Sequence, residues 1–154
     1  EMGIDSGRAL EADRLSGGRP GFAFRYLEDG AFQERRRQDI QDLVRVMNQS
    51  IVEKMRYVEE EYPRGRDMAQ HRARAKGAIQ TWQSFIRDVL LRSANPSAQI
   101  RNVDFIDLVD SLSNRMTPQQ AEGWITACDT AIRRIDGYCN LRLVMDNLLL
   151  ENEN

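Results

Sequence analysis

Signals for a β-protein, a membrane protein or a metal enzyme are scarce in this sequence of 154 residues. Alternating runs of Val, Ile, Thr and aromatic residues, which predict strands, are missing. No apolar run approaches the length that crosses a membrane, and no signal peptide is visible. The single histidine, His71, has no acidic residue three positions before it, so the Glu-x-x-His pairs of di-metal helical bundles are absent. We therefore expect no metal ligands, no membrane segment and a surface or loop-edge position for His71.

Cysteine is also scarce, since the chain holds only Cys128 and Cys139. This pair fits neither a zinc knuckle nor a disulfide framework, and it is typical of a reducing compartment, so we expect a cytoplasmic protein. Cys128 lies on the apolar face of a predicted helix, and we interpret it as a buried side chain. No Gly-x-Ser-x-Gly elbow and no Walker lysine motif occurs. The sequence predicts no catalytic residue and no cofactor.

A large excess of one charge is missing too, because the chain has 22 Lys and Arg residues and 24 Asp and Glu residues. The net charge of −2 gives no overall attraction to nucleic acid or to an acidic membrane. A local basic strip follows an acidic run of three glutamates at residues 59–61. We interpret this region as a self-neutralising corner, with contact to phosphate or DNA as the alternative. The basic strip consists of Arg64, Arg66, Arg72, Arg74 and Lys76.

Helical periodicity of the apolar residues is present almost throughout. It predicts helices over residues 7–15, 20–27, 32–60, 68–93, about 105–112, from 118 onward, and 141–150. Pro20 and Pro118 stand at first helical positions, and Asn140 caps the last helix. The pattern predicts an all-α helical bundle. The face that we expect the long helix of residues 32–60 to bury consists of Ile40, Leu43, Val44, Met47, Ile51, Met55 and Val58.

The start of the chain carries a glycine-rich turn between two predicted helices. The chain opens without an initiator methionine, in helix-like sequence, and we interpret it as part of a longer protein. The turn is formed by Gly18, Arg19, Pro20 and Gly21. Such a turn can hold phosphate, but Pro20 removes a backbone donor, which favours a plain reversal of the chain.

The last predicted helix is apolar around more than one face, which requires cover on two sides. Either a partner chain or a central position in the bundle supplies that cover. We take the helix as the candidate subunit interface, formed by Asn140, Leu141, Val144, Met145, Leu148, Leu149 and Leu150.

Four stretches in this order together resemble the delta-prime subunit of the bacterial DNA polymerase III clamp loader. "GGRPGFAFRYLED" (residues 17–29) resembles the end of its lid domain. "SFIRDVLL" (84–91) and "NVDFIDLV" (102–109) resemble parts of its C-terminal helical domain. "YCNLRLVMDNLLL" (138–150) resembles its closing helix.

The resemblance implies two parts, a C-terminal remnant of an AAA+ lid domain (residues 1–30) and a helical collar domain for oligomerisation (residues 31–154). Collar domains of this family join in a ring that holds the AAA+ modules and loads the sliding clamp during DNA replication. The implied role is non-catalytic assembly within a complex that resembles DNA polymerase III holoenzyme. The implied partners are gamma/tau and delta, with DNA contacted only through the complex. No arginine stands at Gly21, the place of the sensor arginine in ATP-binding relatives, so the turn is not expected to sense phosphate.

Two alternatives remain open. The same helical fold would serve as the collar of another clamp-loader subunit, delta or gamma/tau. A stand-alone helical enzyme or ligand-binding protein would instead use the acidic run with His71. Self-association of the isolated chain is also left open.

Overall fold

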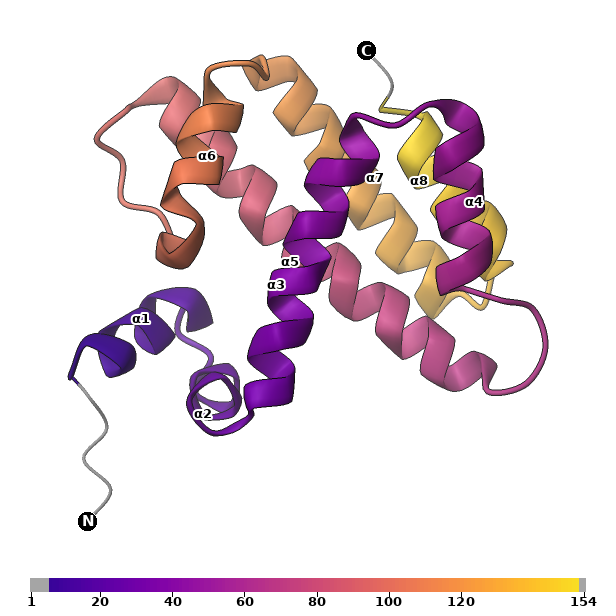
Figure 1. Ribbon diagram of the computed structural model, residues 1–154, viewed down its shortest axis with the longest axis horizontal. Helices are drawn as coiled ribbons and strands as arrows, with labels where there is room; N and C mark the ends of the chain where they lie inside the picture. The colour runs from indigo at the N-terminus through magenta and orange to yellow at the C-terminus, as the bar shows by residue number, and fades with distance from the viewer. Residues whose placement is uncertain (1–5, 153–154) are drawn as a thin grey trace. The chain divides into compact units, whose positions relative to one another are not determined.

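All regular secondary structure in the described part of the chain is helical. The computed structural model describes residues 6–152, and no strand occurs in that range (Figure 1). The predicted all-α fold is therefore confirmed. The expectation that the chain opens in a helix concerns residues 1–5, which lie outside the described residues. The helices are α1 (Ser6–Ser16), α2 (Pro20–Glu28), α3 (Gly30–Met47), α4 (Ile51–Glu61), α5 (Met68–Ala94), the 3-10 helix η1 (Val103–Phe105), α6 (Ile106–Ser113), α7 (Pro118–Asp136) and α8 (Leu141–Leu150).

The chain forms two compact units, and each of them is assembled from two separate stretches of sequence. Unit 1 comprises residues 1–38 and 84–121, and unit 2 comprises residues 39–83 and 122–154. Helices α3, α5 and α7 therefore contribute residues to both units. The predicted division into a lid remnant (1–30) and a collar (31–154) stays a prediction.

Within unit 1, α1 and α2 form a helical hairpin with a small core of its own. Ala12 and Leu15 of α1 are buried together with Tyr26 of α2. The ring of Phe22 packs edge-on against the ring of Phe32 with 5.2 Å between their centroids. Aromatic pairs prefer such edge-to-face geometry, which adds to the energy of burying their area. The hairpin thus holds its shape through side chains from three successive segments.

Unit 2 contains α8, in which seven of ten residues are apolar. Helix α8 contacts α4, and Figure 1 shows the two helices side by side. The Asn140 side chain caps α8 by accepting a hydrogen bond from the Leu143 N–H at 3.2 Å. This cap satisfies one of the backbone donors that a helix start leaves free.

The predicted long helix over residues 32–60 is wrong, because α3 ends at Met47 and α4 begins at Ile51. Ser50 has an extended backbone, and its hydroxyl accepts a hydrogen bond from the Glu53 N–H at 3.4 Å. The Glu53 carboxylate accepts one in return from the Ser50 N–H at 2.8 Å. This reciprocal pair is a capping box, and it starts a new helix at the place where the apolar periodicity alone predicts continuity.

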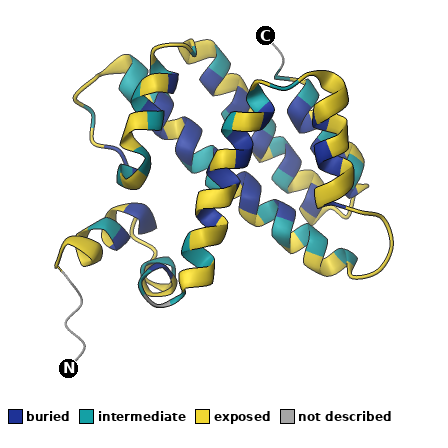
Figure 2. Ribbon diagram, in the orientation of Figure 1, coloured by how far each residue is buried: buried dark blue, intermediate teal, exposed yellow. Residues whose placement is uncertain are grey.

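The break changes which side of α4 is buried. Lys54, Tyr57 and Val58 are buried, whereas Ile51 and Met55 are each 49% exposed. The prediction that Ile51 and Met55 belong to the buried face is therefore wrong, while Val58 is buried as predicted. In Figure 2 the exposed side of α4 appears in yellow.

The candidate interface on the last helix also needs correction. Five of its seven residues are buried within this chain, so they are not free to meet a neighbour. The cause is the position of α8 inside unit 2, which is the alternative to a partner chain that the apolar pattern leaves open. Asn140 is exposed and Leu150 is partly buried. The five buried residues are Leu141, Val144, Met145, Leu148 and Leu149.

Candidate functional site

The most extensively hydrogen-bonded buried group in unit 1 joins two of the sequence motifs. Asp88 of α5 is fully buried, and Asn102, just before η1, is nearly so. One oxygen of Asp88, Oδ2, accepts hydrogen bonds from the Arg101 N–H at 3.0 Å and from the Asn102 N–H at 2.7 Å. The same oxygen accepts a third from Asn102 Nδ2 at 2.6 Å. A charged acceptor therefore fixes the start of η1 against α5.

Arg36 of α3 extends this group. Its guanidinium donates to Asn102 Oδ1 and to both carboxylate oxygens of Asp104. The distance from the Arg36 guanidinium to Asp104 Oδ1 is 3.2 Å. The same guanidinium lies over the ring of Phe105, 5.4 Å from its centroid. Because Arg36 is almost wholly buried, an ion pair with several hydrogen bonds is the arrangement that makes its burial tolerable. We call Arg36, Asp88, Asn102 and Asp104 the unit 1 polar cluster.

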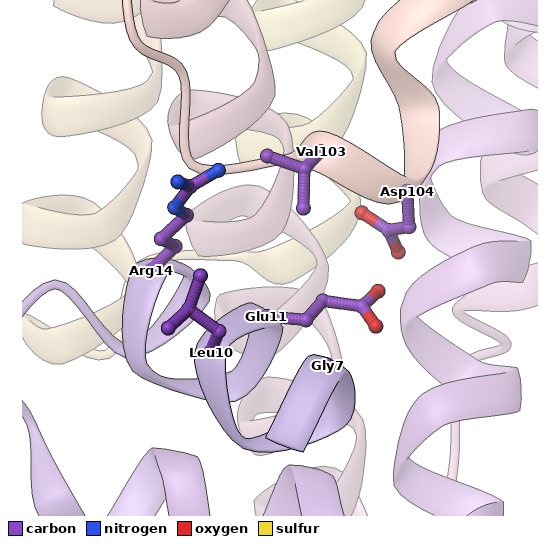
Figure 3. Close-up of a pocket in the computed structure, with 6 residues that line it drawn as sticks. All are labelled: Gly7, Leu10, Glu11, Arg14, Val103 and Asp104. Atoms are coloured by element: carbon purple, nitrogen blue, oxygen red, sulfur yellow. The ribbon is translucent and has the colours of Figure 1, made fainter. Parts of the chain in front are cut away.

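A shallow hollow adjoins this cluster (Figure 3). Its volume of about 330 Å³ is at the lower limit of ligand-sized cavities. Two carboxylates, Glu11 and Asp104, lie on one side of it, and Arg14 lies on the other. The residues that line it are Gly7, Leu10, Glu11, Arg14, Val103 and Asp104.

Both carboxylates of the hollow are already engaged by protein groups. Glu11 accepts a hydrogen bond from the Tyr26 hydroxyl at 2.8 Å, and Asp104 is paired with Arg36. Burial, together with the bond to Glu11, raises the pKa of Tyr26 above its ordinary value, so the hydroxyl remains a donor. In residues 6–152 no group of three or more His, Cys, Asp or Glu side chains is placed to hold a metal ion. Glu11 thus links α1 to α2, and Asp104 links η1 to α3.

The glycine-rich turn between α1 and α2 is closed by its own hydrogen bonds. The Ser16 hydroxyl accepts from the Gly18 N–H at 3.2 Å, and the Ser16 carbonyl accepts from the Arg19 N–H at 3.1 Å. The Arg19 guanidinium lies 5.5 Å from the centroid of the Phe22 ring. Pro20 opens α2 and Gly21 follows it, as the sequence predicts.

Two positive φ values favour glycine directly after α1. Gly17 and Gly18 have φ values of 54° and 84°, in the left-handed region that favours glycine. A β-carbon at Gly17 would also lie 2.8 Å from the guanidinium carbon of Arg101. The guanidinium is the far end of a flexible side chain and can move aside, so the positive φ is the reason for glycine at residue 17.

Unit 2 has its own buried polar group around Asp39. Its carboxylate accepts from Arg74 at 2.6 Å, and its backbone carbonyl accepts from the Trp82 indole N–H at 2.7 Å. Burial alone would lower the pKa of Arg74, but the hydrogen bond and the charge of Asp39 outweigh burial and raise it. Burial raises the pKa of Tyr62 to about 12, although the charge of Arg74 acts in the opposite direction. The hydrogen bonds from Arg74 and Trp82 to Asp39 fix α3 to α5.

The basic strip is largely used inside unit 2. Arg72 donates to the carbonyls of Ile135 at 3.4 Å and of Tyr138 at 3.3 Å. Lys76 pairs with Asp136 at 2.7 Å. Arg72, Arg74 and Lys76 therefore bind partners other than the glutamates of residues 59–61. The predicted self-neutralising corner does not include these three side chains.

The two cysteines and the histidine lie in different environments, and Cys139 is an exposed free thiol. Cys128 is fully buried, as predicted, and burial raises the pKa of its thiol to about 12, so it stays protonated and shielded. His71 is partly buried in the first turn of α5. Glu59 of the acidic run pairs with Arg142 at 3.5 Å.

Sequence reasoning found some members of the unit 1 polar cluster and missed others. Asp88, Asn102 and Asp104 stand in the quoted motifs "SFIRDVLL" and "NVDFIDLV". Arg36 gave no signal, because it sits among three consecutive arginines at residues 35–37 and only the fold selects the one that is buried.

Comparison of the chain with protein-family models, with curated proteins and with solved structures found no match. Among the described helices, none combines the length and the apolar content that crossing a bilayer requires.

Proposed function

We propose that this chain is a non-catalytic assembly module of a bacterial clamp loader, similar to the end of the lid domain and the collar of the delta-prime subunit. Its proposed partners are the gamma/tau and delta subunits, and its proposed setting is the cytoplasm. The all-helical fold of residues 6–152 is compatible with a collar. The order of the four quoted motifs along the chain supports the specific family.

The observation that carries the proposal is the joint role of residues from separate motifs. Asp88 of "SFIRDVLL" and Asn102 of "NVDFIDLV" lie fourteen positions apart and share two short hydrogen bonds in a buried cluster. Asn140 of the closing motif caps α8. Asp88 and Asn102 fix η1 to α5, so both motifs contribute to the core of unit 1 rather than to its surface alone.

The proposal places assembly on surfaces other than the core face of α8. That face is covered by this chain, so it gives rigidity to unit 2 rather than contact with a neighbour. The chemistry of the described residues is consistent with a scaffold, because the acids of the hollow are bonded to Tyr26 and Arg36.

A binding experiment with the subunits of the same organism tests the proposal. The purified chain is mixed at micromolar concentration with the collar domains of gamma/tau and delta and run on a size-exclusion column with light scattering. A complex of defined mass is the expected result, and an unrelated helical bundle of similar size serves as the control. Elution of the chain at its own mass in every mixture would refute the assembly role.

A further inference from the structure

Arg36 of α3 lies between side chains from two segments that are far apart in the sequence. Its guanidinium carbon is 6.0 Å from the centroid of the Tyr26 ring of α2 and 5.4 Å from the centroid of the Phe105 ring of η1. The same guanidinium donates hydrogen bonds to Asn102 and Asp104. A guanidinium can stack on aromatic rings while its fork of N–H groups remains in hydrogen bonds. Arg36 therefore contacts the hairpin of α1 and α2 and the start of η1 at once.

Tyr26 extends this connection to the rest of the hairpin. Its hydroxyl donates a hydrogen bond to Glu11 of α1 at 2.8 Å, and its ring is buried in one cluster with Ala12 and Leu15 of the same helix. Its backbone carbonyl accepts a hydrogen bond from the Gln33 side chain of α3. A displacement of this one ring therefore reaches both helices of the hairpin.

The direct contact between α1 and η1 is looser than the connection through Arg36. The hollow of Figure 3 lies along this contact, because four of its lining residues belong to α1 and the other two to η1. Leu10, one of the four, is 59% exposed. The Arg101 side chain also reaches Gly17, but its flexible end can move aside. Since open space between two segments removes dispersion contacts, Arg36 provides the main connection between the hairpin and η1.

We propose that Arg36 is a positioning residue that couples the α1–α2 hairpin to η1, so that the two segments open and close as one unit. Departure of the hairpin would expose the guanidinium to water, which competes for its hydrogen bonds to Asn102 and Asp104. Departure of η1 would leave a buried guanidinium against the Tyr26 ring without its counter-charge. Each loss weakens the other contact, so a partner that moves the hairpin moves η1 as well, across the predicted boundary at residue 30. The inference does not depend on the proposed function.

The first experiment is native-state hydrogen exchange of the full wild-type chain in low concentrations of urea. Segments that open together share one opening free energy. The most protected amides of residues 6–28 and those of residues 102–105 are therefore expected to exchange with the same opening free energy and the same dependence on urea. A clearly lower opening free energy for residues 6–28 than for residues 102–105 would overturn the proposal, because the hairpin would then open alone.

The second experiment repeats the exchange measurement on a pair of matched variants. Arg36→Met keeps an unbranched side chain and removes the guanidinium, whereas Arg37→Met makes the same change at the exposed neighbour. We expect exchange to become at least tenfold faster in both residues 6–28 and residues 102–105 of Arg36→Met, and less than twofold faster in Arg37→Met. Acceleration confined to residues 102–105, or equal effects of the two variants, would overturn the coupling.

Arg36→Lys keeps the proposal testable if Arg36→Met does not fold. Lysine retains the positive charge but has neither the planar face for the two rings nor the fork that serves Asn102 and Asp104 together. With an unchanged circular dichroism spectrum, this variant is expected to exchange faster than the wild type in both segments. Faster exchange in residues 102–105 with wild-type exchange in residues 6–28 would overturn the proposal. Neither result bears on binding to the gamma/tau and delta collar domains, so failure of the proposed function remains a separate outcome.

Discussion

Replacing Asp88 tests the interaction that carries the proposed function. In Asp88→Ala the N–H groups of Arg101 and Asn102 and the Asn102 side chain lose their common acceptor. In Asp88→Asn the amide oxygen can take the place of Oδ2 and keep all three bonds. The new NH₂ group would take the place of Oδ1, which is buried with no hydrogen-bond partner among the described residues.

The three lost hydrogen bonds set the expected magnitude. Each bond to a charged group contributes roughly 1.5 kcal/mol or more, and removing the buried charge offsets part of the loss, so Asp88→Ala is expected to cost about 3–4 kcal/mol. Asp88→Asn loses only the charge assistance and is left with one buried NH₂, for an expected cost of about 1–2 kcal/mol.

Urea denaturation followed by circular dichroism measures the free energy of unfolding of both variants, and amide exchange at Arg101 and Asn102 reports the local bonds. Faster exchange of these two amides should accompany Asp88→Ala. A cost below about 1 kcal/mol for alanine, or equal costs for the two variants, would show that the Oδ2 bonds do not stabilise unit 1 as argued.

Three further substitutions address the helix break, the core role of α8 and a titrating group. Ser50→Ala should cost about 1 kcal/mol in urea denaturation through loss of the helix cap; a neutral result would mean that α4 does not depend on its capping box. Leu148→Ala should cost about 2–5 kcal/mol by opening a cavity, and a loss under 1 kcal/mol would mean that this side chain is not in a packed core. For Asp146, a raised pKa in the folded state means that its contribution to stability is present below the unfolded pKa and is lost as pH rises through the folded value. The melting temperature of Asp146→Asn relative to that of the wild type should therefore rise as the pH is raised from acid to neutral. A difference that is largest in acid would contradict this sign.

Much of the fold could be predicted, because helix ends carry local chemistry. Pro20 and Asn140 stand at helix starts where their type predicts them. The Ser50 to Glu53 box is equally local, but the apolar residues on both sides continue the same period and conceal the break. A periodic pattern indicates that residues are helical without indicating whether one helix or two contain them.

The candidate site was only partly predictable, because its members come from distant segments. Asp88 and Asn102 stand in motifs that the sequence displays, whereas Arg36 pairs with Asp104 across 68 positions, and nothing local distinguishes it from its arginine neighbours. The burial of α8 was equally hard to predict from the sequence. Its apolar pattern requires cover on two sides, and only the folded chain shows that Leu141 and Leu148 find it within unit 2.

Hydrogen exchange of the chain, alone and with the gamma/tau and delta collar domains, tests the assembly account most directly. The account predicts slower exchange in a contiguous set of exposed residues on mixing and no change at Asp88 and Asn102, which are already buried. Identical exchange of every peptide with and without the collar domains, under conditions where those domains assemble with each other, would contradict it.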